Sequence, residues 1–282
     1  MEFLDAVGSR RSIRWFRPWA DVEPRAVQRI LEAARMCGCP GNLQPWRAVV
    51  VRPGGIDADA RARLIEAAHG QRQMEQAPVW IYWFGDATAA APHAFLAQVT
   101  LGIEIGMLSR EAGWDPDAAR AAIEEGRPTP SGMPALHETV HGLPPQVAAV
   151  LASQETVGAI TVATLAAVDE GLGTCLMIPA SPTTAPVLYE LLGVPEHFVP
   201  VWLQLVGHPA EDPRAGGQRP RERFEDLYAD GRWGTPLARD PEVVAELERE
   251  RLLQEPAPLP GRGEELAHLA RMFGYGPAQE RL

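Results

Sequence analysis

The chain has 282 residues, a formal net charge of −11 and a pI near 5.2, which allow a sizeable core and argue against a nucleic-acid or anionic-membrane partner. All 26 basic residues are arginine. Without lysine the chain can form neither a lysine Schiff base nor a GxxxxGK[ST] nucleotide loop.

The first half of the chain alternates between helix and strand patterns. Asp21 and Pro24 open a predicted helix with apolar side chains at i, i+3, i+4 and i+7. The next patterns predict a strand, a helix, an apolar strand and a second helix over residues 47–52, 56–76, 78–84 and 92–112. The apolar strand lacks alternation, which indicates cover on both of its faces.

The second half begins with a Pro- and Gly-rich loop over residues 126–145, inside a longer region, 113–153, that matches no motif. Four further elements are predicted, a helix, a strand, a helix and a strand, over residues 154–171, 174–178, 184–192 and 198–206. The helices over 92–112 and 154–171 are apolar on more than one side, which is typical of helices buried in a core or against another subunit.

The C-terminal residues 231–282 read as a charged helix over 240–254, a Pro/Gly linker and a short helix over 264–273, and we interpret them as an extension. Three cysteines do not make a disulfide framework, and the N-terminus has no apolar signal segment, so we expect a cytoplasmic protein. The most apolar run, 157–180, is broken by acidic residues and glycines and suits a buried helix and strand better than a membrane span.

A basic stretch near the N-terminus has the form R-R-S-x-R and consists of Arg10, Arg11, Ser12 and Arg14. In an extended segment alternate side chains share a face, so Arg10, Ser12 and Arg14 would point the same way. The apolar Ile13 and Trp15 would lie on the opposite face. Planar, permanently charged guanidinium groups bind phosphate in a bidentate manner, so this stretch predicts an anion site, with a solvated basic turn as the alternative.

Three further stretches follow in a fixed order: Asn42-Leu43-Gln44-Pro45-Trp46 before a strand, Gly171-Leu172-Gly173-Thr174-Cys175-Leu176, and Gly207-His208-Pro209 leading to Arg219-Pro220-Arg221. Together with R-R-S-x-R they resemble the FMN-dependent nitroreductase family over most of residues 1–230. The run that ends at Met177-Ile178-Pro179 is also similar to the deiodinase and flavin-destructase branches of that family.

The resemblance implies an α+β fold, a nitroreductase-like mixed, mostly antiparallel sheet flanked by helices, in an intertwined homodimer with FMN at the interface. It implies an FMN-binding domain over residues 1–230 and a C-terminal helical extension over 231–282 that wraps the domain or the partner subunit.

The resemblance also implies a set of cofactor-binding residues. Those expected on the FMN phosphate, ribityl chain and pyrimidine edge are Arg10, Arg11, Ser12, Arg14 and Arg221, with Arg219 as the alternative late basic residue. Those expected in the flavin loop and at the partner's flavin are Cys39, Pro40, Asn42 and Gln44. Arg72 would be a cation near flavin N1 and O2, although a surface arginine explains it equally well, and the strand end beside N5 and O4 consists of Met177, Ile178 and Pro179.

The implied function is an NAD(P)H oxidoreductase that reduces a nitroaromatic, quinone or enone by ping-pong, two-electron hydride transfer at flavin N5. No catalytic side chain is expected, because the flavin carries the hydride and water can supply the proton. Ile178 offers no hydroxyl to stabilise a flavin radical near N5, which favours two-electron chemistry. The physiological substrate and the choice between NADH and NADPH stay open, as does the use of NAD(P)H itself.

Three alternatives remain. One is an FMN-dependent dehydrogenase, dehalogenase or flavin-cleaving enzyme, and another is a non-catalytic flavin-binding protein. The third is a zinc hydrolase that uses His137, Glu138 and His141, which match the H-E-x-x-H signature. Pro134 and Pro144 leave less than two turns of helix around that motif, so we favour a chance match and expect no metal site.

Overall fold

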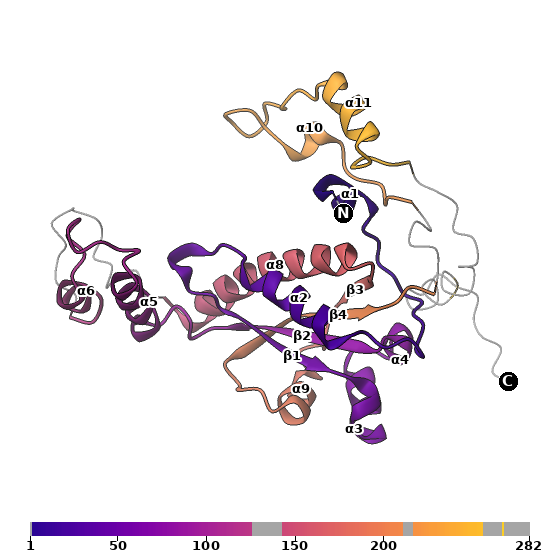
Figure 1. The fold of residues 1–282 in the computed structure, drawn as a ribbon, viewed down its shortest axis with the longest axis horizontal. Coiled ribbons are helices and arrows are strands. Elements are labelled where there is room, and N and C mark those ends of the chain that lie inside the picture. The colour runs from indigo at the N-terminus through magenta and orange to yellow at the C-terminus, as the bar shows by residue number, and fades with distance from the viewer. Residues whose placement is uncertain (1, 126–142, 211–216, 256–266, 268–282) are drawn as a thin grey trace. The chain divides into compact units, whose positions relative to one another are not determined.

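The computed structural model describes residues 2–125, 143–210, 217–255 and 267 (Figure 1). Its centre is a four-stranded sheet in the order β1-β2-β4-β3, in which every neighbouring pair is antiparallel. The strands are β1 (Trp46–Val51), β2 (Val79–Asp86), β3 (Gly173–Met177) and β4 (Phe198–Gly207). This sheet with its surrounding helices confirms the predicted α+β class.

One face of the sheet is covered by α2 (Pro24–Arg35) and α8 (Pro145–Asp169) (Figure 1). The core on this face is built from alternate residues of β2 and from the apolar stripes of both helices: Val79, Ile81, Trp83, Val27, Ile30, Ala34, Ala159, Ile160 and Ala163. Among the described residues, α8 alone is long and apolar enough to span a membrane by length and composition. It packs against α2 and the sheet, as the core helix of a globular fold does.

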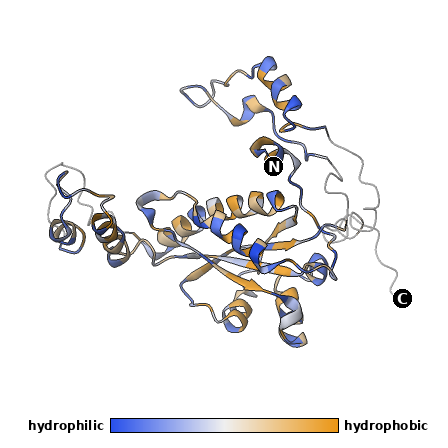
Figure 2. Ribbon diagram, in the orientation of Figure 1, coloured by the Kyte–Doolittle hydropathy of each residue, from blue (hydrophilic) through white to orange (hydrophobic). Residues whose placement is uncertain are grey.

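The opposite face carries α3 (Ala58–Ala67), α4 (Gln73–Gln76) and α9 (Ala185–Leu192) (Figure 1). Trp80 on β2 donates its indole N–H to the carbonyl of Met74 at 3.1 Å, and Thr184 donates to the carbonyl of Ala67 at 3.0 Å. Every residue of β2 is buried, as its unbroken apolar run predicts, and the strands are coloured mainly as hydrophobic in Figure 2.

Several predicted boundaries were wrong. The single helix expected over 56–76 is divided into α3 and α4, because His69 and Gly70 both have φ of +64° and break the helix; a 3-10 turn, η2 (Pro53–Gly55), precedes it. The helix expected over 92–112 ends earlier, as α5 (Pro92–Glu104).

The region 113–153, which matches no motif, contains α6 (Pro116–Ile123) and the beginning of α8, neither of which was predicted. Helix α6 packs on α5 through a small apolar cluster of Leu96, Val99, Ile103 and Ile123. Most of the predicted loop over 126–145 and nearly all of the predicted helix over 264–273 lie outside the described residues.

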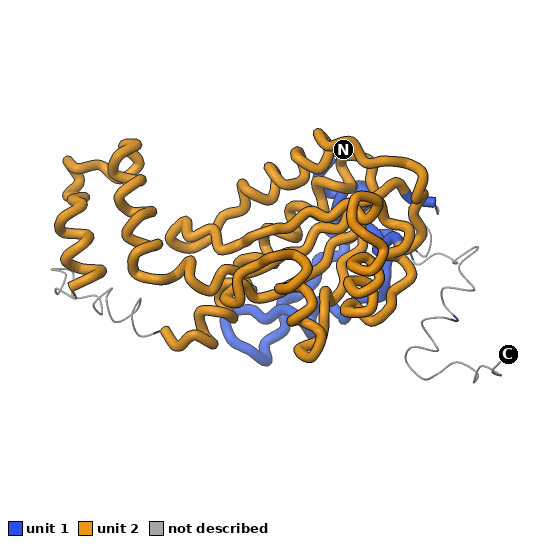
Figure 3. Tube along the Cα trace, turned by 90° about the horizontal axis from the view of Figure 1, so that it is seen from below, with its two compact units in different colours: residues 1–13, 209–282 blue, residues 14–208 orange. Residues whose placement is uncertain are grey.

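The chain divides into two compact units (Figure 3). Residues 14–208 contain the sheet and its helices, and residues 1–13 and 209–282 form the other unit. The second unit contains α1 (Phe3–Ser9), α10 (Phe224–Leu227) and α11 (Pro241–Arg249). Helix α11 is shorter than the helix predicted over 240–254, and the predicted domain boundary at residue 230 stays a prediction.

Candidate functional site

Arg11 is the most deeply buried of the predicted phosphate ligands, with 9 % of its surface exposed. It follows α1, in the unit that joins the two ends of the chain. Its Nη1 donates to the carbonyls of Gly8 and Arg10 at 2.6 and 2.9 Å, and its Nη2 donates to Oε1 of Gln254 at 3.0 Å. All three partners are neutral, so the guanidinium is held in place while its charge is retained.

The surroundings of Arg11 disfavour its charged form. Burial lowers the pKa of Arg11, and the positive charges of Arg10 and Arg221 lower it further. Its Nε is buried and makes no hydrogen bond within the described residues. A buried cation with a vacant donor and two cationic neighbours is costly unless an anion binds it.

Both late basic residues lie in the same unit as Arg11. Arg219, Arg221 and Arg239 line an open groove of about 480 Å³ together with residues of α11. Nη1 of Arg221 donates to the carbonyls of Arg219 and Pro220 at 3.0 and 3.2 Å. The positive charge of Arg221 lowers the pKa of Arg11, whereas Arg219 has no such effect. Arg221 is therefore favoured over Arg219 as the C-terminal arginine of the predicted phosphate site.

The rest of the R-R-S-x-R stretch runs across the boundary between the two units. Ser12 is half-buried and belongs to the unit of residues 1–13 and 209–282, and Arg14 is half-buried and belongs to the unit of residues 14–208. Ile13 and Phe16 are buried and anchor the stretch. Ile13 was expected to face the core, whereas the inward position of Arg11 was not foreseen.

The predicted flavin loop lies in the sheet-containing unit and begins at η1 (Pro40–Asn42). Gly41, Asn42 and Gln44 have φ of +61°, +53° and +47°. Two non-glycine residues in the left-handed region cost free energy, and such strain collects at functional sites.

Side-chain contacts hold this loop in shape. Asn42 donates to Oε1 of Gln98 on α5 at 3.0 Å, and the backbone N–H of Gln44 points to Sγ of Cys39 at 3.1 Å. Arg47 donates to the carbonyl of Gln44 and to the buried carboxylate of Asp86, both at 2.8 Å. The strained loop is therefore tied to α5 and to the end of β2.

The strand end predicted beside the flavin consists of the buried Met177, the exposed Ile178 and Pro179. Arg72 is exposed at the start of α4, and the polar side chain that reaches this strand end is its neighbour Gln73. Nε2 of Gln73 lies 3.6 Å from Sδ of Met177 and 2.5 Å from Oε1 of Gln71.

Gln73 was not predicted, because the family resemblance implies a cation at this place and Gln73 is neutral. The feature that could have indicated Gln73 is its side-chain amide beside the apolar Met74, which is fully buried in the structure. An amide carries both a donor and an acceptor, and can therefore meet the N–H and carbonyl groups of a heterocycle.

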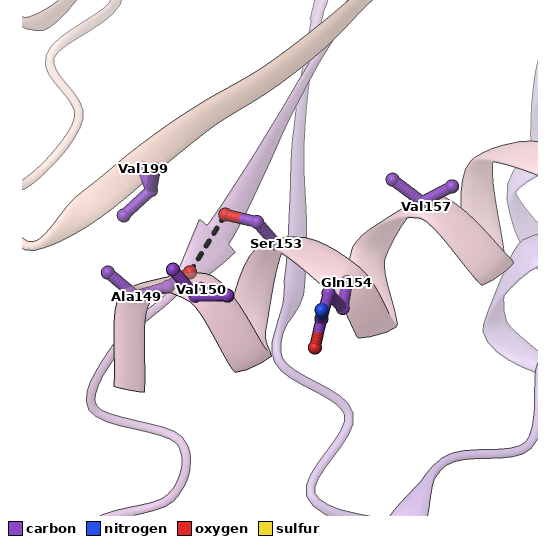
Figure 4. A pocket seen from close by; sticks show the side chains of 6 residues that line it. All are labelled: Ala149, Val150, Ser153, Gln154, Val157 and Val199. Carbon is purple, nitrogen blue, oxygen red and sulfur yellow. Dashed lines mark hydrogen bonds between the residues drawn. The ribbon is translucent and has the colours of Figure 1, made fainter. Parts of the chain in front are cut away.

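A second groove, of about 300 Å³, lies beside α8 and is lined by Ala149, Val150, Ser153, Gln154, Val157 and Val199 (Figure 4). Its one hydroxyl, on Ser153, donates to the carbonyl of Ala149 at 2.8 Å. The groove is thus an apolar surface without converging polar groups, unlike the arginine-lined groove.

The H-E-x-x-H motif at His137, Glu138 and His141 lies outside the described residues. In the part of the chain that the structure describes, no group of three or more His, Cys, Asp or Glu side chains is arranged to hold a metal ion.

These features define an α+β protein with a buried arginine near two further arginines and a strained loop that carries two side-chain amides. The model of the nitroreductase family matches residues 7–208, and the chain belongs to this family.

Individual relatives agree with this assignment. An NADH dehydrogenase of Thermus thermophilus is 45 % identical over 85 residues, which are 30 % of this chain and 38 % of the relative's length. A protein of Exiguobacterium sibiricum, assigned as a nitroreductase and solved in complex with FMN, has a TM-score of 0.63 at 22 % identity and covers 82 % of this chain and 98 % of its own. A Staphylococcus epidermidis protein assigned as an NAD(P)H:FMN oxidoreductase has a TM-score of 0.64 at 16 % identity, over 81 % and 95 % of the two chains.

Proposed function

We propose that the protein is an FMN-dependent oxidoreductase that uses NAD(P)H to reduce a small organic acceptor such as a nitroaromatic, a quinone or an enone. The observation that carries the proposal is the buried, cation-flanked Arg11. Family membership and the names of the relatives support it: one is an NADH dehydrogenase, one was solved with FMN, and one is assigned as an NAD(P)H:FMN oxidoreductase.

The residues present fit the phosphate of FMN. A phosphate monoester carries nearly two negative charges and several acceptor oxygens, which complement Arg11, Arg10 and Arg221. The vacant Nε of Arg11 would gain a partner. Ser12 and Arg14 would complete the phosphate and ribityl site, with Arg219 as the alternative to Arg221.

The flavin ring would be bound by neutral groups of the sheet-containing unit. Cys39, Pro40, Asn42 and Gln44 offer a preformed loop with two side-chain amides. The strand end of Met177, Ile178 and Pro179 would lie beside the ring. We propose Gln73, in addition to Arg72, as a polar group at the pyrimidine side of the ring.

When bound, FMN would supply two-electron hydride chemistry between NAD(P)H and the acceptor. The chain contributes binding, orientation and fixed charge. Arg11 and its neighbours would hold the phosphate, the strained loop would orient the ring, and no side chain is assigned a proton-transfer role. Ile178 is exposed at the strand end and offers no hydroxyl.

The proposal includes a homodimer in the cytoplasm. The outer face of α8 exposes Val147, Val150, Leu151 and Val157, which a second copy of the chain would cover. The three cysteines, Cys37, Cys39 and Cys175, form no disulfide, which suits a reducing compartment.

The test is an absorbance spectrum of the purified protein, followed by anaerobic addition of NADH and then NADPH. We expect a yellow protein that bleaches with at least one of them and recovers its colour when a quinone is added. A yellow protein that neither reductant bleaches would point to a dehydrogenase, dehalogenase, flavin-cleaving enzyme or flavin carrier. A colourless protein that takes up no added FMN would contradict the proposal and lead to a zinc assay.

A further inference from the structure

We infer that Gln254, in the segment after α11, is a positioning residue that sets the affinity for FMN by orienting the guanidinium of Arg11. The inference rests on the proposed function. Gln254 lies 46 residues beyond His208, the last residue that the family model matches. The C-terminal extension would therefore complete the phosphate site of its own chain.

Every polar group of the Gln254 side chain has a partner. Oε1 accepts from Nη2 of Arg11 at 3.0 Å, and Nε2 donates to the carbonyl of Arg251 at 2.6 Å. The backbone N–H of Gln254 donates to Oε1 of Gln218 at 3.0 Å. The amide is thus fixed on both sides, and its oxygen can point only toward Arg11.

Gln218 closes the network. Its Nε2 donates to the carbonyl of Gly8 at 3.1 Å and to the carbonyl of Leu252. The same Gly8 carbonyl accepts from Nη1 of Arg11 at 2.6 Å. Arg11, Gly8, Gln218 and Gln254 therefore form a closed ring of hydrogen bonds that joins the first and last described segments of this unit.

The backbones of the two segments also touch directly. A Cβ added to Gly8 would lie 1.9 Å from the carbonyl oxygen of Arg251, so only glycine permits this approach. Arg251 itself has φ of +66°, and its Nε lies 3.1 Å from a carboxylate oxygen of Asp5. The segment after α11 therefore packs against α1 through a close backbone contact as well as through hydrogen bonds.

The chemistry of Gln254 suits a positioning role. A guanidinium has five N–H donors, of which three are used here, so Nε and one N–H of Nη2 remain for a phosphate. A carboxylate at position 254 would hold the fork equally well but would neutralise it. The neutral amide fixes the orientation of Arg11 and leaves its full charge for the ligand.

The experiment measures dissociation constants of the full-length apo-protein for FMN and for riboflavin, which lacks the phosphate, by quenching of flavin fluorescence. We expect Gln254→Ala to weaken FMN about fivefold to tenfold and to leave riboflavin unchanged. We expect Gln254→Glu to weaken FMN by roughly a further tenfold, because its carboxylate competes with the phosphate for Arg11. Gln28→Ala, an exposed glutamine on α2, serves as the matched control.

The outcomes separate the two ideas. A wild-type protein that binds neither flavin would overturn the proposed function and this inference together. A wild-type protein that binds FMN, with Gln254→Glu binding it equally well, would overturn the inference alone. Equal losses for FMN and riboflavin, or a lower urea midpoint for both apo-variants, would assign Gln254 a structural role and also overturn it.

Discussion

At the scale of single residues, Arg11 is the side chain on which the proposed site depends most. Its position could be predicted from the R-R-S-x-R pattern. Its burial could not, because the neutral partner Gln254 is 243 residues away and belongs to a stretch without a recognisable motif.

We predict that Arg11→Lys weakens FMN binding by about tenfold and leaves riboflavin binding unchanged, measured by fluorescence titration. A lysine keeps the charge but lacks the planar fork, so it cannot bind the Gly8 and Gln254 oxygens and a phosphate together. Arg25→Lys, on the exposed face of α2, is the control. Unchanged FMN affinity in the Arg11 variant would show that the fork is not used.

Tyr82 gives a second prediction at this scale. It is fully buried in β2, and its hydroxyl makes no hydrogen bond within the described residues. Because an unsatisfied buried hydroxyl is unfavourable, we expect Tyr82→Phe to raise the free energy of unfolding by about 1 kcal/mol in urea titrations at pH 7. A loss of stability would show that the hydroxyl has a partner.

The same substitution should change the response to alkali. Burial raises the pKa of Tyr82 above its ordinary value of 10.0, so the folded state keeps the proton that the unfolded state loses. The contribution of the Tyr82 hydroxyl to the free energy of unfolding is constant below pH 10. Above pH 10 it decreases by about 1.4 kcal/mol per pH unit. The advantage of Tyr82→Phe over the wild type should therefore grow between pH 10 and 11, and a constant difference would contradict this assignment.

At the scale of elements, the close approach of α8 to β2 depends on Gly85. A Cβ at this position would lie 2.9 Å from the carbonyl carbon of Ala152, which is a backbone atom that cannot move aside. We expect Gly85→Ala to destabilise the fold by about 2 kcal/mol, because α8 must shift away from the sheet.

The control for this prediction is Gly54→Ala, where an added Cβ meets nothing within 4 Å. It should change stability by less than about 0.5 kcal/mol. Equal effects of the two variants would show that contact with α8 is not the reason for glycine at position 85.

Most elements could be predicted from the local pattern of apolar residues. The apolar spacing of α2 and the unbroken apolar run of β2 were sufficient. The helix expected over 56–76 failed because His69 adopts a left-handed conformation that a pattern search does not consider. Besides the expectation of a cation, the contact of Gln73 with Met177 could not be predicted because it joins two elements that are 104 residues apart in the chain.

At the scale of the whole molecule, the exposed apolar face of α8 predicts self-association. We expect the wild type to sediment as a dimer in analytical ultracentrifugation. Val157→Asp should sediment as a monomer, because a charge would be buried in the interface. Val243→Asp, an equally exposed valine on α11, should remain dimeric. A dimeric Val157→Asp protein would exclude this face as the interface.

The division into two units could not be predicted from the sequence. The composition changes near residue 231, and the extension was therefore placed there. The contacts instead group residues 209–282 with residues 1–13, because Gln218 and Gln254 bond to the segment that contains Gly8 and Arg11. Hydrogen bonds between distant segments depend on the folded geometry and produce no periodic residue pattern in either segment.

The ring of hydrogen bonds around Arg11 also has a consequence for biosynthesis. Arg11 leaves the ribosome among the first residues, whereas Gln254 is added 243 residues later, after on the order of ten seconds or more at ordinary translation rates. During that interval the sheet can form, but the arginine stays without the neighbour that orients it. On the proposed function, full affinity for the flavin is thus reached only late in the synthesis of each polypeptide, and a chain truncated before residue 254 would bind FMN more weakly.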